Sequence, residues 1–370
     1  MRKKKTKEFQ EITSSKFIKT FFISAIILLI FFGGLVVLFD PFYHYHKPLG
    51  FLKAVLSEKE YQVPGTLDNF DYDAVIAGSS VAENNNNKWF DENFNCKSIK
   101  AIRSYGATAD LCYFINRAFD HQNVKYVFLN LDPSSLTTGT KTSFEETGSP
   151  MYLYDKNPLN DVKYLFNKDV IFNRIPYSIA NSFVGDYDEG ESYNWAQWKA
   201  FDEDTVLYHY IQEPDFKEML SPDTFKETAQ TNIDNILSIV NAHPETEFYI
   251  FIPPYSILWW DMSFRNGETE SYLYAEKMAL SQLLPCKNVK VFNFQNAEDI
   301  IFELNNYTDS LHFSPEINKY ICDCLKEGKY EIKDDSQLES SLENVHSYAI
   351  EASSYITSTY GDKVKVAVYD

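Results

Sequence analysis

The chain has 370 residues and a formal net charge of −19, from 34 Lys and Arg against 53 Asp and Glu. Its length suits one large domain with insertions or two smaller domains. So acidic a balance disfavours nucleic-acid binding, and a strongly anionic polymer would need a local basic groove or a counter-cation. Five cysteines do not suggest a disulfide framework, although they leave room for one bond, from Cys96 to Cys112.

The first element along the chain is an uncharged apolar segment from Thr20 to Phe39, which is long enough to cross a bilayer as a helix. Residues 1–19 carry seven Lys and Arg against two Glu. The positive-inside rule therefore places this tail in the cytoplasm and the rest of the chain outside. The apolar run exceeds a usual signal-peptide core and no small-x-small cleavage pattern follows it, so we expect an uncleaved single-pass anchor.

Residues 40–70 form an irregular juxtamembrane segment. Within it, His44-Tyr45-His46 could be interpreted as a metal-binding pair, but an interfacial aromatic belt is the preferred interpretation. No Cys or His spacing in the chain is typical of zinc sites. We therefore expect no metal.

From residue 71 the sequence alternates as in an α/β fold with a parallel sheet. We expect this domain to cover residues 71–329, with an aromatic, Asp- and Asn-rich insertion at about 137–213 and a C-terminal extension over 330–370. The expected elements in chain order are strands at 74–77, 98–102 and 125–131 with a helix at 108–120, then a helix ending at 241, a strand ending at 253, a helix at 268–284, a strand at 289–294, and helices at 315–326 and 337–360.

Two short motifs suggest chemistry. Gly78-Ser79-Ser80 follows the first strand, where a sharp turn can present Ser80 to a cleft and aim backbone N–H groups at an oxyanion. Asp309 lies three residues before His312 in the loop that enters the last core helix. Such a carboxylate can bind the imidazole Nδ1–H and leave Nε2 to take a serine proton. Each motif alone is weak, so the prediction of a Ser80–His312–Asp309 triad rests on the pair.

In this order the motifs resemble the SGNH/GDSL hydrolase superfamily, particularly its membrane-anchored extracytoplasmic branch. That branch includes polysaccharide O-acetyltransferases and the D-alanylation proteins of lipoteichoic acid, and local features such as "DPFYHYHKPL" look like a Gram-positive subfamily. The resemblance covers about residues 71–329. It implies a three-layer, flavodoxin-like parallel sheet with helices on both faces, preceded by one transmembrane helix. It further implies that Ser80 is the nucleophile, that Asp309 and His312 form the last block, and that Gly106 donates its backbone N–H to the oxyanion.

The sequence departs from the family pattern at two places. Ser79 replaces the aspartate of Gly-Asp-Ser, as in acyltransferase-like branches, and the third-block Gly-x-Asn-Asp is missing after the third strand. "FLNLDPSSL" offers Asn130 or Asp132 instead. The Asn130 amide could donate to an oxyanion, whereas an ionised Asp132 could only accept, and would fix a loop or bind a substrate hydroxyl.

The leading hypothesis is a cell-envelope acyl-transfer enzyme, either an O-acyltransferase or an esterase, that acts on a wall polymer or exopolysaccharide without a cofactor. The N–H groups of Ser80 and Gly106 would stabilise the oxyanion. Trp259 and Trp260 could stack on sugars, although such residues more often pack in a core. The alternative is a non-catalytic binding or scaffold protein of the same fold that partners a multi-span membrane acyltransferase.

Overall fold

The computed structural model describes residues 2–184 and 188–368, with residues 2–13 described as backbone only. Met1 of the expected tail, residues 185–187 of the expected insertion and residues 369–370 of the expected extension lie outside the described part. The chain divides into two compact units. The first contains the chain up to Val55 and a segment that starts at Pro150, and the second contains Leu56–Ser149 and the chain from Asp188 onward.

The second unit is built on a six-stranded sheet with the order β2-β1-β3-β5-β6-β7. The first five strands in that order are parallel and the short edge strand β7 is antiparallel to β6. The strands are β1 Ala74–Gly78, β2 Ser98–Ile102, β3 Tyr126–Asn130, β5 Glu247–Ile252, β6 Val289–Asn293 and β7 Glu331–Ile332. The expected α/β class with a mostly parallel sheet and helices around it is confirmed.

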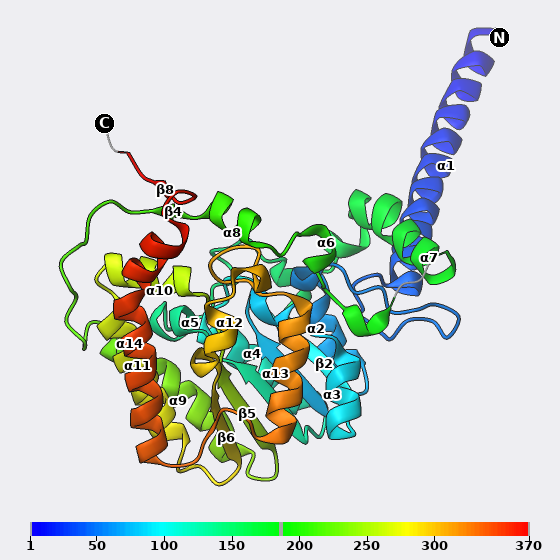
Figure 1. Cartoon of the computed structure of the whole chain (residues 1–370). Helices are drawn as coiled ribbons and strands as arrows, with labels where there is room; N and C mark the ends of the chain where they lie inside the picture. The colour runs from blue at the N-terminus through cyan, green and yellow to red at the C-terminus, as the bar shows by residue number, and fades with distance from the viewer. Residues whose placement is uncertain (1, 185–187, 369–370) are drawn as a thin grey trace. The chain divides into compact units, whose positions relative to one another are not determined.

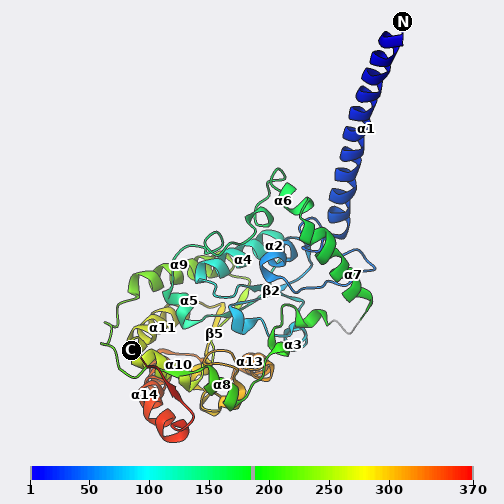
Figure 2. The same cartoon turned by 90° about the horizontal axis from the view of Figure 1, so that it is seen from above.

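Helices cover both faces of this sheet (Figure 2). Helices α2, α4 and α9 lie along one face, and α3 and α13 pack together on the other. The helices of the second unit are α2 Lys59–Asn69, α3 Asn87–Phe94, α4 Thr108–His121, α5 Pro133–Thr137, α8 Glu203–His209, α9 Lys226–Ala242, α10 Ile257–Arg265, α11 Thr269–Leu283, α12 Glu298–Ile301, α13 Pro315–Glu327 and α14 Asp335–Tyr360.

An aromatic layer joins the sheet to α3. The ring of Phe128 on β3 lies 4.8 Å from that of Phe90 and 4.6 Å from that of Phe94, both on α3. Tyr249 on the neighbouring strand β5 completes the layer at 5.2 Å from Phe128. Burial of these rings holds β3 in the middle of the sheet, next to β1, the strand that Ser80 follows.

Residues 330–370 contribute to the second unit through β7, α14 and a short strand. Helix α14 packs against α10 and α11, and its buried residues recur every three or four positions, as a single buried helical face requires. They include Leu338, Leu342, Val345 and Ala349. The strand β8 Lys365–Val366 pairs with β4 Ile211–Gln212 in a separate two-stranded sheet.

The first unit is formed around α1 Arg2–Phe39, whose stretch from Ser14 to Phe39 is long and apolar enough to cross a membrane. Beside the C-terminal end of α1 lie α6 Val162–Leu165, a π-helical turn Val170–Arg174 and α7 Ile175–Phe183 (Figure 1). The residues of the expected aromatic belt, His44-Tyr45-His46, are half-buried. They fold around Asp40, which accepts their backbone N–H groups.

All five cysteines lie in the described part of the chain and are free thiols. The disulfide from Cys96 to Cys112 that the sequence left open is therefore absent. Cys112 is buried on α4, whereas the Cys96 thiol follows α3 and contacts the carbonyl of Phe90.

Truncation of Phe128 to alanine should lower the free energy of unfolding by about 3–5 kcal/mol, because it leaves a cavity within the aromatic layer. Chemical denaturation of the full chain in detergent, followed by near-UV circular dichroism, measures this change. Trp198→Ala is the matched control, because that ring is 79% exposed and its loss should cost less than about 0.5 kcal/mol. Equal effects of the two substitutions would contradict the described core.

Candidate active site

Ser80 stands at the turn that leaves β1. The strand ends at Gly78, and a 3₁₀ turn begins at Ser80 and ends at Ala82. A Cβ at Gly78 would lie 2.7 Å from the Cβ of Ala82 and 2.8 Å from that of Asn130, so a side chain does not fit there. Glycine thus allows the sharp reversal that raises Ser80 above the sheet. The first N–H groups of a helical turn have no acceptor within the turn, so the turn itself does not use the N–H of Ser80.

His312 and Asp309 lie in the loop that precedes α13, and the structure brings them to Ser80. The Oγ of Ser80 is 2.8 Å from Nε2 of His312, and Nδ1 of His312 is 2.8 Å from Oδ2 of Asp309. These distances are within hydrogen-bond range. If Nδ1 carries its proton and donates it to Asp309, Nε2 is left as the acceptor for the Ser80 hydroxyl.

The surroundings of Asp309 favour its ionised form. Burial would raise the pKa of this carboxyl, but the hydrogen bonds from the His312 ring and from the backbone N–H groups of His312 and Leu311 outweigh burial and lower the pKa. The carboxylate therefore keeps its negative charge at neutral pH, where it can orient the imidazole and stabilise an imidazolium.

Residues outside the two motifs hold this geometry. The indole N–H of Trp195 donates to the carbonyl oxygen of Ser80 at 3.1 Å, and the indole packs edge-on against the His312 ring at 5.1 Å between centroids. From α13, the Asn318 amide donates to the carbonyl of Val81 at 3.0 Å. Sequence reasoning missed both residues, because neither belongs to a recognisable motif and Trp195 comes from the expected insertion.

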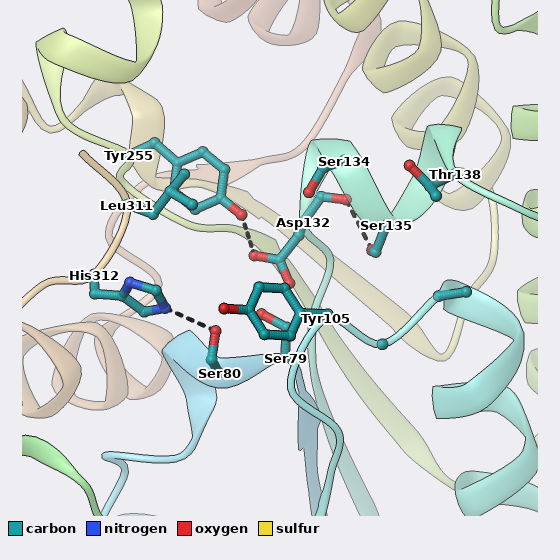
Figure 3. Close-up of a pocket in the computed structure, with 12 residues that line it drawn as sticks. Ser79, Ser80, Tyr105, Asp132, Ser134, Ser135, Thr138, Tyr255, Leu311 and His312 are labelled. Carbon is teal, nitrogen blue, oxygen red and sulfur yellow. Dashed lines mark hydrogen bonds between the residues drawn. The ribbon is translucent and has the colours of Figure 1, made fainter. Parts of the chain in front are cut away.

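A pocket of about 260 Å³ opens beside Ser80 and His312 (Figure 3). Ligand pockets usually have volumes of about 300–1,000 Å³, so this one suits a small group. Its lining consists mainly of small, hydroxyl-bearing and aromatic side chains: Ser79, Ser80, Tyr105, Gly106, Ala107, Asp132, Ser134, Ser135, Thr138, Tyr255, Leu311 and His312.

Tyr105 is a pocket residue that the motifs did not indicate. Its side chain is 93% exposed, and its φ of 54° lies in the left-handed region, where a tyrosine is uncommon. Non-glycine residues in such conformations cluster at functional sites. The Tyr105 ring projects over the space next to Ser80 in Figure 3.

Asp132, which the sequence suggested as a substrate-binding residue, lines the same pocket. The hydroxyl of Tyr255 donates to its Oδ1, and the carboxyl is buried. Burial raises the pKa of Asp132, and side-chain hydrogen bonds from Tyr255, Ser79 and Asn130 partly offset this rise. The group is therefore a buried carboxyl that neighbouring side chains hold at the edge of the pocket.

The predicted oxyanion donors have different outcomes. Gly106 lines the pocket, but its N–H donates to the carbonyl of Arg103 at 3.0 Å and is already engaged. A Cβ at Gly106 would lie 2.9 Å from Arg103 atoms, so a tight turn accounts for this glycine. Asn130 is buried beside Gly78 and is not among the residues that line the pocket. A hydrogen bond from its side chain lowers the pKa of Asp132. An oxyanion would therefore compete with the Asp132 carboxyl for this amide.

Of the two roles that the sequence left open for Trp259 and Trp260, core packing is the one observed, and sugar stacking is contradicted. Trp260 is fully buried and Trp259 is 9% exposed. The two rings pack edge-on at 4.7 Å, and Trp259 also packs against Tyr255 at 5.0 Å. They lie in the first turn of helix α10 and face the core.

Comparison with known proteins does not place the chain in a family. No family model matches it, and neither does any curated protein. The resemblance to SGNH/GDSL hydrolases therefore rests on this chain's own residues: the Gly78–Ser80 turn and the loop with Asp309 and His312.

Proposed function

We propose that this protein is an acyl-transfer enzyme with Ser80 as its nucleophile, His312 as its general base and Asp309 as the residue that orients the base. The observation that carries this proposal is the continuous hydrogen-bonded chain from Ser80 Oγ through His312 to Asp309, with 2.8 Å at each step. A serine, a base and an orienting carboxylate in this geometry constitute the arrangement that activates a hydroxyl for attack.

In the proposed reaction, Ser80 Oγ attacks the carbonyl carbon of an ester or thioester while its proton passes to His312 Nε2. The N–H of Ser80 and the side-chain amide of Asn130 stabilise the resulting oxyanion. The tetrahedral intermediate collapses, and the leaving group takes the proton from His312. A second hydroxyl then gives its proton to His312, attacks the acyl-serine and releases Ser80. Water in this step makes the protein an esterase, and a sugar hydroxyl makes it an O-acyltransferase.

The strand order supports the SGNH-like, flavodoxin-like form of this proposal. Numbered among themselves, the five parallel strands have the order 2-1-3-4-5, which is the order of flavodoxin-like doubly wound sheets. Such sheets bind ligands at the carboxyl ends of their strands, where the strand order reverses between the first and third strands. Ser80 follows β1 and Asp132 follows β3, so the pocket opens at this reversal.

The pocket and the anchor indicate the substrate class. A volume of about 260 Å³ accommodates a short acyl group better than a long lipid chain. If α1 anchors the protein with its pocket outside the cytoplasm, the acceptors within reach are hydroxyls of a cell-wall polymer or exopolysaccharide. A multi-span membrane acyltransferase would be the partner that carries the acyl group across the bilayer.

One observation favours the second candidate function, a non-catalytic scaffold for such an acyltransferase. The N–H of Gly106 is engaged with Arg103, so one of the two backbone oxyanion donors is missing in this conformation. Loss of a single donor costs a catalyst about 10²–10³ in kcat. A binding protein would not be affected by this loss.

A fluorophosphonate probe should label the full chain on Ser80, because the hydroxyl that His312 activates displaces fluoride from the phosphorus. Gel fluorescence and peptide mass spectrometry detect the adduct. Labelling should vanish in Ser80→Ala and fall strongly in His312→Ala. The matched control is Ser134→Ala, which removes an exposed pocket serine outside the triad and should label like wild type. Undiminished labelling of Ser80→Ala would reject Ser80 as the activated serine.

Hydrolysis of a small activated acetyl ester separates the enzyme from the scaffold. Ser80→Ala and His312→Ala should each lower kcat/KM by at least about 10³-fold, and Asp309→Asn should leave more activity than either. Each variant should keep the thermal unfolding midpoint of wild type, since a polar substitution in an open cleft costs less than about 0.5 kcal/mol. If Ser80→Ala equals wild type here and in restoring envelope acylation to a deletion strain, the scaffold function replaces the enzyme.

The proposed orientation places the basic tail in the cytoplasm and both ends of the pocket-bearing unit outside. Protease added to intact cells stripped of their wall should therefore digest the chain beyond Phe39 and leave a fragment that contains α1. Immunoblots with tags at residue 1 and residue 370 report the two ends. If the C-terminal tag survives until the membrane is lysed, the proposed orientation is wrong.

A further inference from the structure

A segment of the first unit, residues 159–184, packs against α1 inside the apolar stretch of that helix. The ring of Phe166 lies 3.6 Å from the position that a Cβ would take at Gly33. The ring of Phe172 meets that of Phe32 at 6.2 Å between centroids. Both partners on α1 belong to the run of residues that is apolar enough to cross a membrane. We call residues 159–184 the side segment.

The position of these contacts along α1 determines how deep the contacting part of the side segment lies in a bilayer that α1 spans. Gly33 precedes the end of α1 at Phe39 by six residues, which at 1.5 Å per residue corresponds to about 9 Å along the helix axis. If α1 spans a bilayer with Phe39 near the edge of the hydrocarbon, Phe166 and Phe172 lie below that edge. Interfacial helices bury their apolar face to a similar depth, about 5–10 Å.

The side segment presents an apolar stripe that suits this depth. Phe172, Pro176, Ile179 and Phe183 are spaced by four, three and four residues along the π-helical turn and α7, which places them on one helical face. The side chains of Phe172 and Phe183 are 65% and 63% exposed. A contiguous apolar face that is exposed in this way marks an interaction or membrane site.

A different side of α7 is attached to the rest of the first unit. Ser182 Oγ accepts the backbone N–H of Lys53 at 3.1 Å. At the other end of the segment, the Tyr164 hydroxyl donates to Asp40 at 2.8 Å, directly after α1, and its ring stacks on that of Phe42 at 5.4 Å. The Tyr164 contacts fix the beginning of the side segment to the end of α1, and the Ser182 contact fixes the end of α7 to the segment that follows α1.

We propose that the side segment is a membrane-interface element, and that its stripe of Phe172, Pro176, Ile179 and Phe183 lies in the boundary between the headgroups and acyl chains of the bilayer that α1 spans. The occupant of this face is lipid, because the face continues the lipid-exposed surface of α1 at the same level. Exposed Lys163 and Lys168 lie on the same segment, where they can reach lipid phosphates. This inference does not depend on the proposed enzyme function.

The test is depth-dependent fluorescence quenching of the full chain in lipid nanodiscs. Single cysteines replace Phe172 or Phe183, after alanine has replaced the two half-buried native cysteines, Cys96 and Cys286, and each is labelled with a bimane. Brominated acyl chains should quench most of the emission at both positions, while aqueous iodide should quench little. Ile27→Cys on the exposed face of α1 is the control for lipid, and Ile350→Cys, 47% exposed on α14, is the control for water.

A second measurement needs no substitution in the side segment. A lipid with a diazirine in its acyl chain, irradiated with the wild-type chain in nanodiscs, should form adducts on peptides from residues 159–184 as well as from α1. If both labels respond as Ile350 does and the side segment carries no adduct, the proposal is overturned. A face that instead docks a partner protein also gives water-like quenching and no adduct, because the nanodisc contains no partner.

Discussion

The hydrogen bond from Ser80 to His312 is the constraint on which the pocket depends, because it joins two residues 232 positions apart in the chain. Neither residue contributes a strand or a core side chain. They meet because parallel strands end at one edge of the sheet, where the turn after β1 and the loop before α13 are neighbours. Proper pairing of the sheet is thus a precondition for any chemistry at Ser80.

Preorganisation of this pair comes from residues with no chemistry of their own. Trp195 and Asn318 bind the carbonyl oxygens of consecutive residues, Ser80 and Val81, from two different segments. Together they clamp the backbone of the turn, while the serine side chain keeps its freedom to face His312. A hydroxyl held at hydrogen-bond distance before substrate arrives avoids an entropic cost in the transition state.

The sequence predicted what is encoded locally and the meeting of the two motifs, but it missed several residues whose roles depend on tertiary contacts. Strand and helix patterns anticipated the parallel sheet, and the spacing of Asp309 and His312 anticipated their contact, because three residues suffice to close that loop. Gly106 was misjudged, since only the folded turn shows its N–H bound to Arg103. For Trp259 and Trp260 the sequence left sugar stacking open beside core packing, because the burial of an aromatic pair depends on neighbours distant in sequence. Trp195 and Tyr105 carry no periodic or motif signal.

The attachment of α6 to the end of α1 has a consequence for biosynthesis. Asp40 leaves the ribosome more than 120 residues before its partner Tyr164, so α1 can enter the membrane long before the first unit is complete. During that interval the buried carboxylate site has no tyrosine hydroxyl. The same dependence acts in reverse when the anchor is removed: a shortened chain that starts after Asp40 retains Tyr164, Phe166 and Phe172 without their contacts to Asp40, Gly33 and Phe32. Removal of the anchor therefore exposes further apolar surface on the first unit, and the shortened chain should aggregate more readily than the full chain in detergent.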